Sequence, residues 1–219
     1  MIKAVIFDVD GTLLDTERIY MQAWKEAAAE LGYEITDELL RKTRAINVKD
    51  AARIFEAEIG NGFSYDTVRA VRVRIAEEII HRESPILKPG VLELLDWLEK
   101  KGIRLSVASS TNVKGTHSHL AESGIDQRFE VVVGGDMVAK GKPNPDIFLK
   151  AADLLGLAPE ACIVVEDSPA GIRAANAAGM KAVLVPDQAA ITDEIVAMSD
   201  VVLQSLVDMP AYMEGLIKV

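Results

Sequence analysis

The sequence has little cysteine, no long uncharged run and no excess of positive charge. A single cysteine, Cys162, excludes an internal disulfide and any cysteine-based zinc site, and is typical of the reducing cytosol. The longest stretch without a charged residue covers nine residues, 105–113, whereas a membrane-spanning helix needs about 20. Only four residues separate Lys3 from Asp8, which leaves no room there for a secretory hydrophobic segment. We therefore expect a cytoplasmic protein.

The excess charge is negative. Asp and Glu number 34 against 24 Lys and Arg, which gives a net charge of −10 over 219 residues. The electrostatic field of a protein with this net charge repels phosphate groups. We therefore expect no nonspecific binding to nucleic acid or to an anionic membrane. No obligate protein partner is indicated either. If a phosphate is the substrate, local positive groups must overcome this field.

The hydrophobic pattern changes twice along the chain. Residues 3–8 form a short apolar run that predicts a buried strand, and residues 16–84 show only helical periodicity. From residue 85 onward, helical segments alternate with apolar strands, which predicts a parallel sheet covered on both faces. We therefore expect an α/β core made of residues 1–15 and 85–219, and an all-helical insert over 16–84.

The first predicted strand ends in FDVDGTLLD. Asp8 and Asp10 lie two positions apart, so they point to the same side of an extended chain, and Gly11 allows a sharp turn beneath them. Two crowded carboxylates repel each other unless a cation or a shared proton stabilises them. An ordinary surface turn is the alternative interpretation. A calcium loop is disfavoured, because Ile19 stands where such a loop carries its glutamate.

Three further segments place polar side chains after apolar runs. Ser109 and Ser110 end one predicted strand, Lys142 lies in KGKPNPD, and Glu166 and Asp167 end another strand. Taken singly, each is explained by helix capping or, for Lys142, by a solvated surface charge. Taken together, they converge on the carboxyl edge of one parallel sheet. Hard oxygen ligands suit Mg²⁺, and a serine and a lysine suit the oxygens of a phosphoryl group.

With these motifs the chain resembles the haloacid dehalogenase superfamily, in particular its branch of sugar-phosphate phosphatases and β-phosphoglucomutases. The matching segments span essentially the whole chain and are DVDGTLLD (8–15), Ser109, KPNPD (142–146) and EDSPAGIRAANAAG (166–179). The resemblance implies a Rossmann-like core with a small helical cap domain inserted after the first strand. It also implies a Mg²⁺-dependent reaction through an aspartyl-phosphate.

The resemblance and the chemistry of the side chains suggest a role for each motif. Asp8 is expected to attack phosphorus as the nucleophile, and Asp10 to act first as general acid and then as general base. Ser109, Ser110 and Lys142 are expected to bind the phosphoryl oxygens. By resemblance, the main-chain carbonyl of Asp10 also binds the metal. The expected Mg²⁺ ligands are Asp8, Asp10, Asp167 and, directly or through water, Glu166.

Substrate recognition is expected in the insert, where the candidate contacts are Tyr20, Trp24, Asn47 and Arg72. The alternative for Trp24 is the core of the insert, and for Arg72 a solvated helix face paired with nearby acidic residues. The mutase branch carries a histidine at the position of Tyr20, and a glycine and an arginine where Ala45 and Val48 stand. These departures favour a phosphatase of small phosphorylated metabolites, most simply sugar phosphates, over a hexose-phosphate mutase. A binding module that keeps metal and ligand without turnover is the alternative of another class.

The histidines predict no metal site. His117 and His119 are two apart on a predicted helix, so their side chains diverge, and neither has a partner four positions away. His81 stands alone. The sequence therefore assigns them no function.

Overall fold

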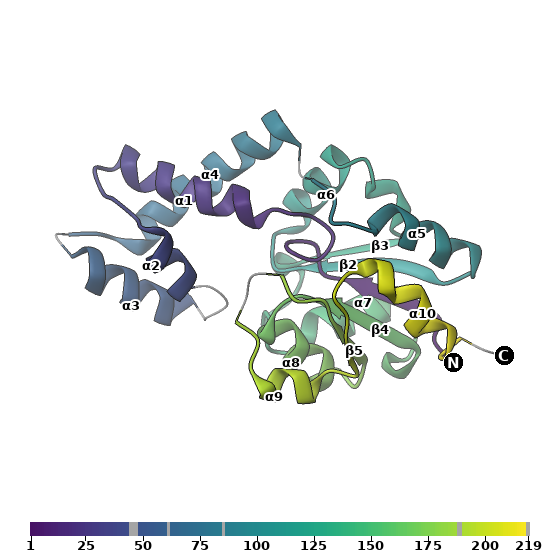
Figure 1. Cartoon of the computed structure of the whole chain (residues 1–219). Coiled ribbons are helices and arrows are strands. Elements are labelled where there is room, and N and C mark those ends of the chain that lie inside the picture. Colours follow the sequence, from purple (N-terminus) through teal and green to yellow (C-terminus); the bar gives the residue numbers. More distant parts are fainter. Residues whose placement is uncertain (44–47, 61, 85, 188–189, 218–219) are drawn as a thin grey trace. The chain divides into compact units, whose positions relative to one another are not determined.

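The computed structural model describes residues 1–43, 48–60, 62–84, 86–187 and 190–217 (Figure 1). The chain divides into two compact units, one made of Met1–Asp15 and Ile86–Val219 and the other of Thr16–Pro85. The first unit holds a parallel sheet with helices. The described residues of the second unit form helices and connecting turns without strands. The predicted α/β class is confirmed.

Six strands form the sheet: β1 (Ala4–Phe7), β2 (Arg104–Ser109), β3 (Val131–Gly134), β4 (Cys162–Glu166), β5 (Lys181–Leu184) and β6 (Val201–Val202). They lie in the order β3-β2-β1-β4-β5-β6, and every neighbouring pair is parallel. Phe7 at the end of β1 pairs with Val107 on one side and Val165 on the other. The carboxyl ends of β1, β2 and β4 therefore meet in the middle of one sheet edge.

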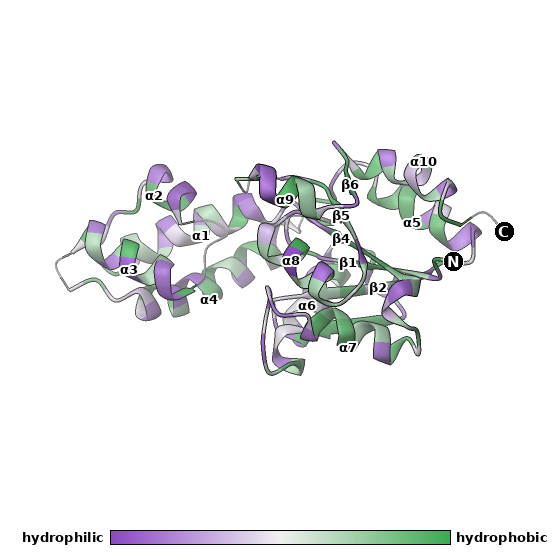
Figure 2. Ribbon diagram, turned by 90° about the horizontal axis from the view of Figure 1, so that it is seen from below, coloured by the Kyte–Doolittle hydropathy of each residue, from purple (hydrophilic) through white to green (hydrophobic). Residues whose placement is uncertain are grey.

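Two hydrophobic cores cover the two faces of the sheet. Val5 and Phe7 lie in one core, whereas Ala4 and Ile6 lie in the other. A strand buried on both faces needs an apolar residue at every position, which explains the unbroken AVIF run. Figure 2 shows hydrophobic residues along the strands. The first core receives residues from α5 (Val91–Lys100), α6 (Val113–Glu122) and α10 (Met209–Glu214), and the second from α7 (Asp146–Leu154), α8 (Pro169–Ala177) and α9 (Asp193–Met198).

The helical unit has a core of its own. Its helices are α1 (Glu17–Glu30), α2 (Asp37–Lys42), α3 (Val48–Ile59) and α4 (Tyr65–Glu83). Ile19, Ala23 and Ala27 recur every four residues on α1 and are fully buried. They belong to one hydrophobic cluster with Val68 and Ile79 of α4, because small alanines allow the two helices to approach closely.

Backbone hydrogen bonds join the two segments of the first unit that flank the helical unit. Leu14 forms an antiparallel bridge with Leu87, and the Asp15 amide donates to the Ile86 carbonyl at 2.8 Å. The Lys88 amide donates to the carbonyl of Leu13 at 2.9 Å. The segment by which the chain leaves the sheet-bearing unit and the segment by which it returns therefore lie side by side.

Several elements differ from the sequence-based expectation or were not predicted. The first strand ends at Phe7, so the alternation of an extended chain does not reach Asp10. Helices α9 and α10 were not predicted, because six-residue helices carry too few turns for a clear periodicity. Short 3-10 turns occur at η1 (Asp126–Arg128), η2 (Gly135–Met137), η3 (Pro159–Ala161) and η4 (Leu206–Asp208). No helix in the described ranges has the length and apolar character needed to span a membrane.

Candidate active site

The carboxyl edge of the sheet brings the predicted polar residues of the core together. Asp8 directly follows β1 and is fixed to the neighbouring strand, because its amide donates to the Val165 carbonyl at 2.9 Å. Ser109 is the last residue of β2 and Glu166 the last of β4. Asp8, Ser109 and Glu166 are all buried. The ends of three adjacent strands thus place three polar side chains at the carboxyl edge of the sheet.

Lys142 is the positive centre of this edge. Its ammonium group donates to Asp8 Oδ1 at 2.5 Å, to Glu166 Oε1 at 2.6 Å and to the Ala108 carbonyl at 3.1 Å. The side chain is only 5% exposed, and the ammonium lies 5.0 Å from the centre of the Phe148 ring. The interpretation of Lys142 as a solvated surface charge is therefore wrong.

Burial and neighbouring charges shift the pKa values of Asp8 and Lys142. Burial raises the pKa of Asp8 to about 8, and the carboxylates of Glu166 and Asp10 act in the same direction, whereas Lys142 lowers it. Burial would lower the pKa of Lys142, but the attraction of Asp8 and Glu166 outweighs burial and holds that pKa above its ordinary value. Further positive charge near Asp8 would therefore favour its ionised form.

Glu166 is held by donors on both oxygens. While Oε1 accepts from Lys142, Oε2 accepts from the amides of Asp167 and Ser168, each at 3.0 Å, and from Ser168 Oγ at 2.8 Å. Its carboxylate lies against Gly171 at the start of α8, where a Cβ atom would come within 1.8 Å of it. Glu166 thus orients Lys142 and the beginning of α8. Its predicted contact with a metal competes with these hydrogen bonds.

Asp167 lies against the turn that follows Asp8. Gly11 has φ +89°, and a Cβ atom there would lie 2.5 Å from Asp167 Oδ2. Glycine is therefore required both for the turn and for the close approach of the carboxylate. Asp167 is 8% exposed and Asp8 7% exposed, so both residues are buried next to this turn.

This donor set fits Mg²⁺. In the part of the chain that the structure describes, no group of three or more His, Cys, Asp or Glu side chains is placed to hold a metal ion. Mg²⁺ does not need one, because it binds through one or two carboxylates and keeps several waters. Asp8, Asp167 and the Asp10 carbonyl supply hard oxygen atoms of that kind.

Asp10 is turned toward the loop after β2. Its Oδ2 accepts from Thr111 Oγ1 at 3.1 Å and from Ser109 Oγ at 3.4 Å, and its Oδ1 lies 3.9 Å from His119 Nδ1. The neighbouring Ser110 is exposed, and its backbone lies close to Gly135. The structure therefore brings Ser109 to Asp10 and leaves Ser110 at the surface of the same loop.

Sequence reasoning missed Thr111 and His119. Thr111 follows two serines in SSTN, where helix capping is the ordinary interpretation, and Asn112 fills that role by accepting from the Gly115 amide at 2.8 Å. His119 was considered only as a metal ligand. The SSTN run was a weak signal for Thr111, and the sequence offers none for His119.

In the helical unit, three of the four candidate substrate contacts line one pocket. Tyr20, Trp24 and Arg72 surround a hollow of about 180 Å³. The Arg72 guanidinium lies 4.1 Å from the centre of the Tyr20 ring and 5.9 Å from that of Trp24. Trp24 also stacks on Phe55, at 5.0 Å between ring centres, so it serves the core of this unit as well. Asn47 lies outside the described residues.

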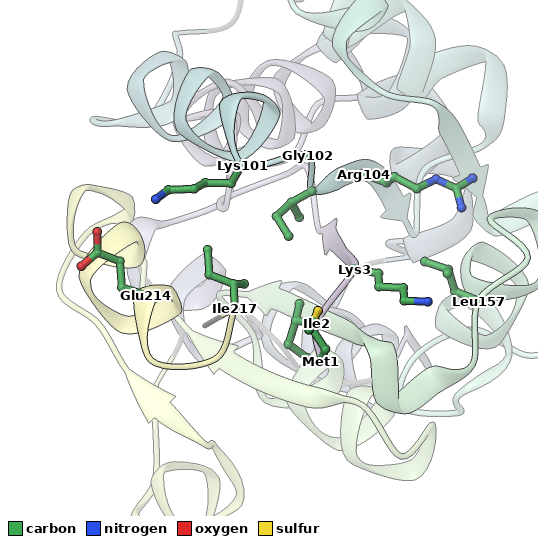
Figure 3. A pocket seen from close by; sticks show the side chains of 10 residues that line it. Met1, Ile2, Lys3, Lys101, Gly102, Arg104, Leu157, Glu214 and Ile217 are labelled. Atoms are coloured by element: carbon green, nitrogen blue, oxygen red, sulfur yellow. The ribbon is translucent and has the colours of Figure 1, made fainter. Parts of the chain in front are cut away.

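A larger hollow, of about 820 Å³, lies at the opposite, amino-terminal edge of the sheet (Figure 3). Its charged lining residues are Lys3, Lys101, Arg104 and Glu214. The Arg104 guanidinium is already paired with Glu130 and with the Leu155 carbonyl. The lining of this hollow holds one carboxylate, whereas several carboxylates gather at the carboxyl edge of the sheet.

Comparisons with known proteins give a family model and several relatives that match most of the chain. The family model described as "Haloacid dehalogenase-like hydrolase" matches residues 5–185. The chain is 34% identical over 181 residues to the "Phosphorylated carbohydrates phosphatase" of Thermotoga maritima, covering 82% of each chain. It is 31% identical over 193 residues to "Beta-phosphoglucomutase" of Bacillus subtilis, covering 83% of this chain and 82% of that one. A solved structure of CbbY from Rhodobacter sphaeroides in complex with phosphate superposes with a TM-score of 0.81 at 28% identity, over 95% of this chain and 96% of that one.

Proposed function

The chain belongs to the haloacid dehalogenase-like hydrolase family, and we propose that it hydrolyses phosphate monoesters of small metabolites, most simply sugar phosphates, with Mg²⁺. The observation that carries this proposal is the placement of Lys142 between Asp8 and Glu166 at the edge where Asp10 and Asp167 also lie. We assign residues 1–15 and 85–219 to the catalytic core and residues 16–84 to a cap domain.

In the first step Asp8 acts as the nucleophile. One carboxylate oxygen attacks phosphorus, the bond between phosphorus and the ester oxygen breaks, and an aspartyl-phosphate forms on Asp8. Asp10 gives a proton to the departing oxygen, so that the alcohol leaves neutral. Mg²⁺, when bound by Asp8, Asp167 and the Asp10 carbonyl, offsets the repulsion between Asp8 and the phosphate dianion.

In the second step water attacks the phosphorus atom of the aspartyl-phosphate. Asp10, now ionised, takes a proton from that water, and the bond between phosphorus and Asp8 breaks. Inorganic phosphate and the original Asp8 carboxylate result. The same residue thus serves both steps in opposite directions.

The phosphoryl oxygens need positive partners that are already in place. Lys142 supplies a buried cation whose position Glu166 and the Ala108 carbonyl fix. Ser109 supplies a hydroxyl at the end of β2, and we assign Ser110 a weaker part because it is exposed. Groups held in advance at the developing charge act without reorganisation, which makes them effective in the transition state.

Tyr20, Trp24 and Arg72 are the proposed specificity residues of the cap. The aromatic rings suit the carbon skeleton of a sugar, and the guanidinium suits an anionic or hydroxyl-rich group. The Arg72 guanidinium lies over the Tyr20 ring, which supports a packing or substrate-contact role for Tyr20 rather than that of a proton carrier. The similarity to a β-phosphoglucomutase keeps a mutase as the second candidate.

Free phosphate distinguishes the two candidates. We expect the protein, incubated with Mg²⁺ and hexose 1-phosphates or 6-phosphates, to release phosphate in proportion to the substrate consumed. A mutase would exchange the two isomers and release little phosphate. Isomer exchange about 10-fold faster than phosphate release or more would contradict the phosphatase proposal. No Mg²⁺-dependent release from p-nitrophenyl phosphate or from the sugar phosphates would favour a binding module. A cytoplasmic location remains a prediction.

A further inference from the structure

We propose that Thr111 and His119 are positioning residues that hold the carboxylate of Asp10 when Ser109 turns to the substrate. This inference rests on the proposed function, because it concerns the acid of that reaction. It goes beyond it by assigning roles to a threonine in the loop after β2 and to a buried histidine on α6.

The first step of the argument concerns the single proton of Ser109. Its oxygen accepts a hydrogen bond from the Thr111 amide at 3.0 Å, and its hydroxyl donates to Asp10 Oδ2 at 3.4 Å. A serine hydroxyl has one proton to donate. If Ser109 donates to a phosphoryl oxygen, its bond to Asp10 must break.

Thr111 is already in place to keep Asp10 oriented. Its hydroxyl lies 3.1 Å from Asp10 Oδ2, closer than that of Ser109. Its backbone is fixed from both sides, because its amide donates to Ser109 Oγ and its carbonyl accepts from the Gly135 amide at 2.8 Å. Gly134 permits this packing, since a Cβ atom there would lie 2.1 Å from the Val113 amide nitrogen.

His119 faces the other oxygen of Asp10. Its side chain is 6% exposed, and its Nδ1 atom, 3.9 Å from Asp10 Oδ1, is buried without a hydrogen-bond partner among the described residues. A buried polar atom without a partner is destabilising, so an arrangement that gives it one is favoured. A movement of about 1 Å by the Asp10 carboxylate brings Oδ1 into hydrogen-bond range. With its ring proton on Nδ1, His119 then donates a hydrogen bond to Asp10. This bond replaces the one that Ser109 no longer donates.

This arrangement predicts an effect that depends on the leaving group. An alkoxide must be protonated as it departs, so a misplaced Asp10 slows the attack of Asp8 on an alkyl phosphate. The p-nitrophenolate ion leaves without that proton. A residue that only supported the fold would affect both substrates equally.

The test compares kcat/KM for a hexose 6-phosphate and for p-nitrophenyl phosphate in two pairs of variants. Thr111→Val and His119→Leu remove the polar group, whereas Thr111→Ser keeps the hydroxyl and His119→Asn keeps a donor at the place of Nδ1. We expect the first member of each pair to lose about 10-fold or more with the sugar phosphate and less than about 2-fold with the aryl phosphate. The second member should recover most of that loss.

An equal loss with both substrates, or no loss with either, would overturn the inference. Circular dichroism and the melting temperature show whether each variant folds, and if His119→Leu does not, the Thr111 pair decides. Asp10→Ala is the reference for the proposed function. If Asp10→Ala itself shows no preference between the two leaving groups, the assignment of Asp10 as the acid fails, independently of Thr111 and His119.

Discussion

The ammonium group of Lys142 lies 2.6 Å from Glu166 Oε1, and both side chains are almost completely buried, at 5% and 1% exposure. A buried cation is stable only when its partners offset the loss of hydration. Glu166 supplies one such partner, and donors from Asp167 and Ser168 hold it in turn. Substitutions of Lys142, Glu166 and their neighbours are therefore expected to affect activity, stability and metal dependence to different extents.

The pair itself gives the first prediction. Lys142→Met should lower kcat by about 100-fold or more, because the substrate loses a fixed cation. It should also destabilise the protein by roughly 3–5 kcal/mol, because a buried carboxylate is left unpaired. Steady-state kinetics and urea unfolding measure the two effects. The exposed Lys140, two positions earlier, is the matched control, and Lys140→Met should change neither. Unchanged activity in Lys142→Met would contradict the role in phosphoryl binding.

The nucleophile gives the second prediction. Asp8→Asn replaces an attacking carboxylate by an amide of the same shape, so turnover should be abolished while the fold is retained. Phosphate release and circular dichroism measure these outcomes. If the variant kept more than a few per cent of the activity, another residue would have to be the nucleophile.

Metal dependence gives the third prediction. Asp167→Ala should raise the Mg²⁺ concentration for the half-maximal rate by about 10-fold or more, because a hard oxygen ligand is lost. Thr36→Ala is the control, since Thr36 caps α2 by accepting from the Leu39 amide at 3.2 Å and lies in the helical unit. It should cost about 1 kcal/mol of stability and leave the Mg²⁺ requirement unchanged. An unchanged requirement in Asp167→Ala would point instead to Glu166 as the ligand.

Gly171 gives the fourth prediction. Alanine usually favours a helix over glycine by about 1 kcal/mol, but at this position a Cβ atom would lie 1.8 Å from the Glu166 carboxylate. Gly171→Ala should therefore destabilise the protein and reduce activity by displacing Glu166 from Lys142. At Gly141 a Cβ atom would meet nothing within 4 Å, so Gly141→Ala serves as the control. A stable and fully active Gly171→Ala variant would show that Glu166 tolerates displacement.

The cap gives the fifth prediction. Arg72→Met should raise KM for a phosphorylated sugar by about 10-fold while leaving kcat/KM for p-nitrophenyl phosphate nearly unchanged. Arg74 lies on the same helix, but its guanidinium is paired with Glu30 and Glu78 at the surface. Arg74→Met should change neither value, since exposed ion pairs contribute little. Equal effects of the two substitutions would argue against recognition by Arg72.

The α/β class could be predicted because strands buried on both faces leave unbroken apolar runs. The strand ends then indicated where Asp8, Ser109 and Glu166 would gather. The sequence could not show that Lys142 is buried, because a lysine is solvated by default and its partners lie 134 and 24 positions away. Nor could it show the contact of Thr111 with Asp10, which joins residues 101 positions apart. Such contacts depend on how loops pack after the strands have paired.

Residues 13–15 pair with residues 86–88. In the topology of the chain, the helical unit between them therefore corresponds to the loop of a hairpin. The chain leaves and returns at adjacent backbone atoms, so the strand order of the sheet does not depend on what lies between them. The entropy cost of closing such a loop grows only slowly with its length, by about 0.6 kcal/mol for each doubling. Insertions, deletions or a complete exchange of the intervening helices therefore change the stability of the sheet only slightly. The strands and the residues at their ends can therefore keep their positions while the helices between residues 15 and 86 change.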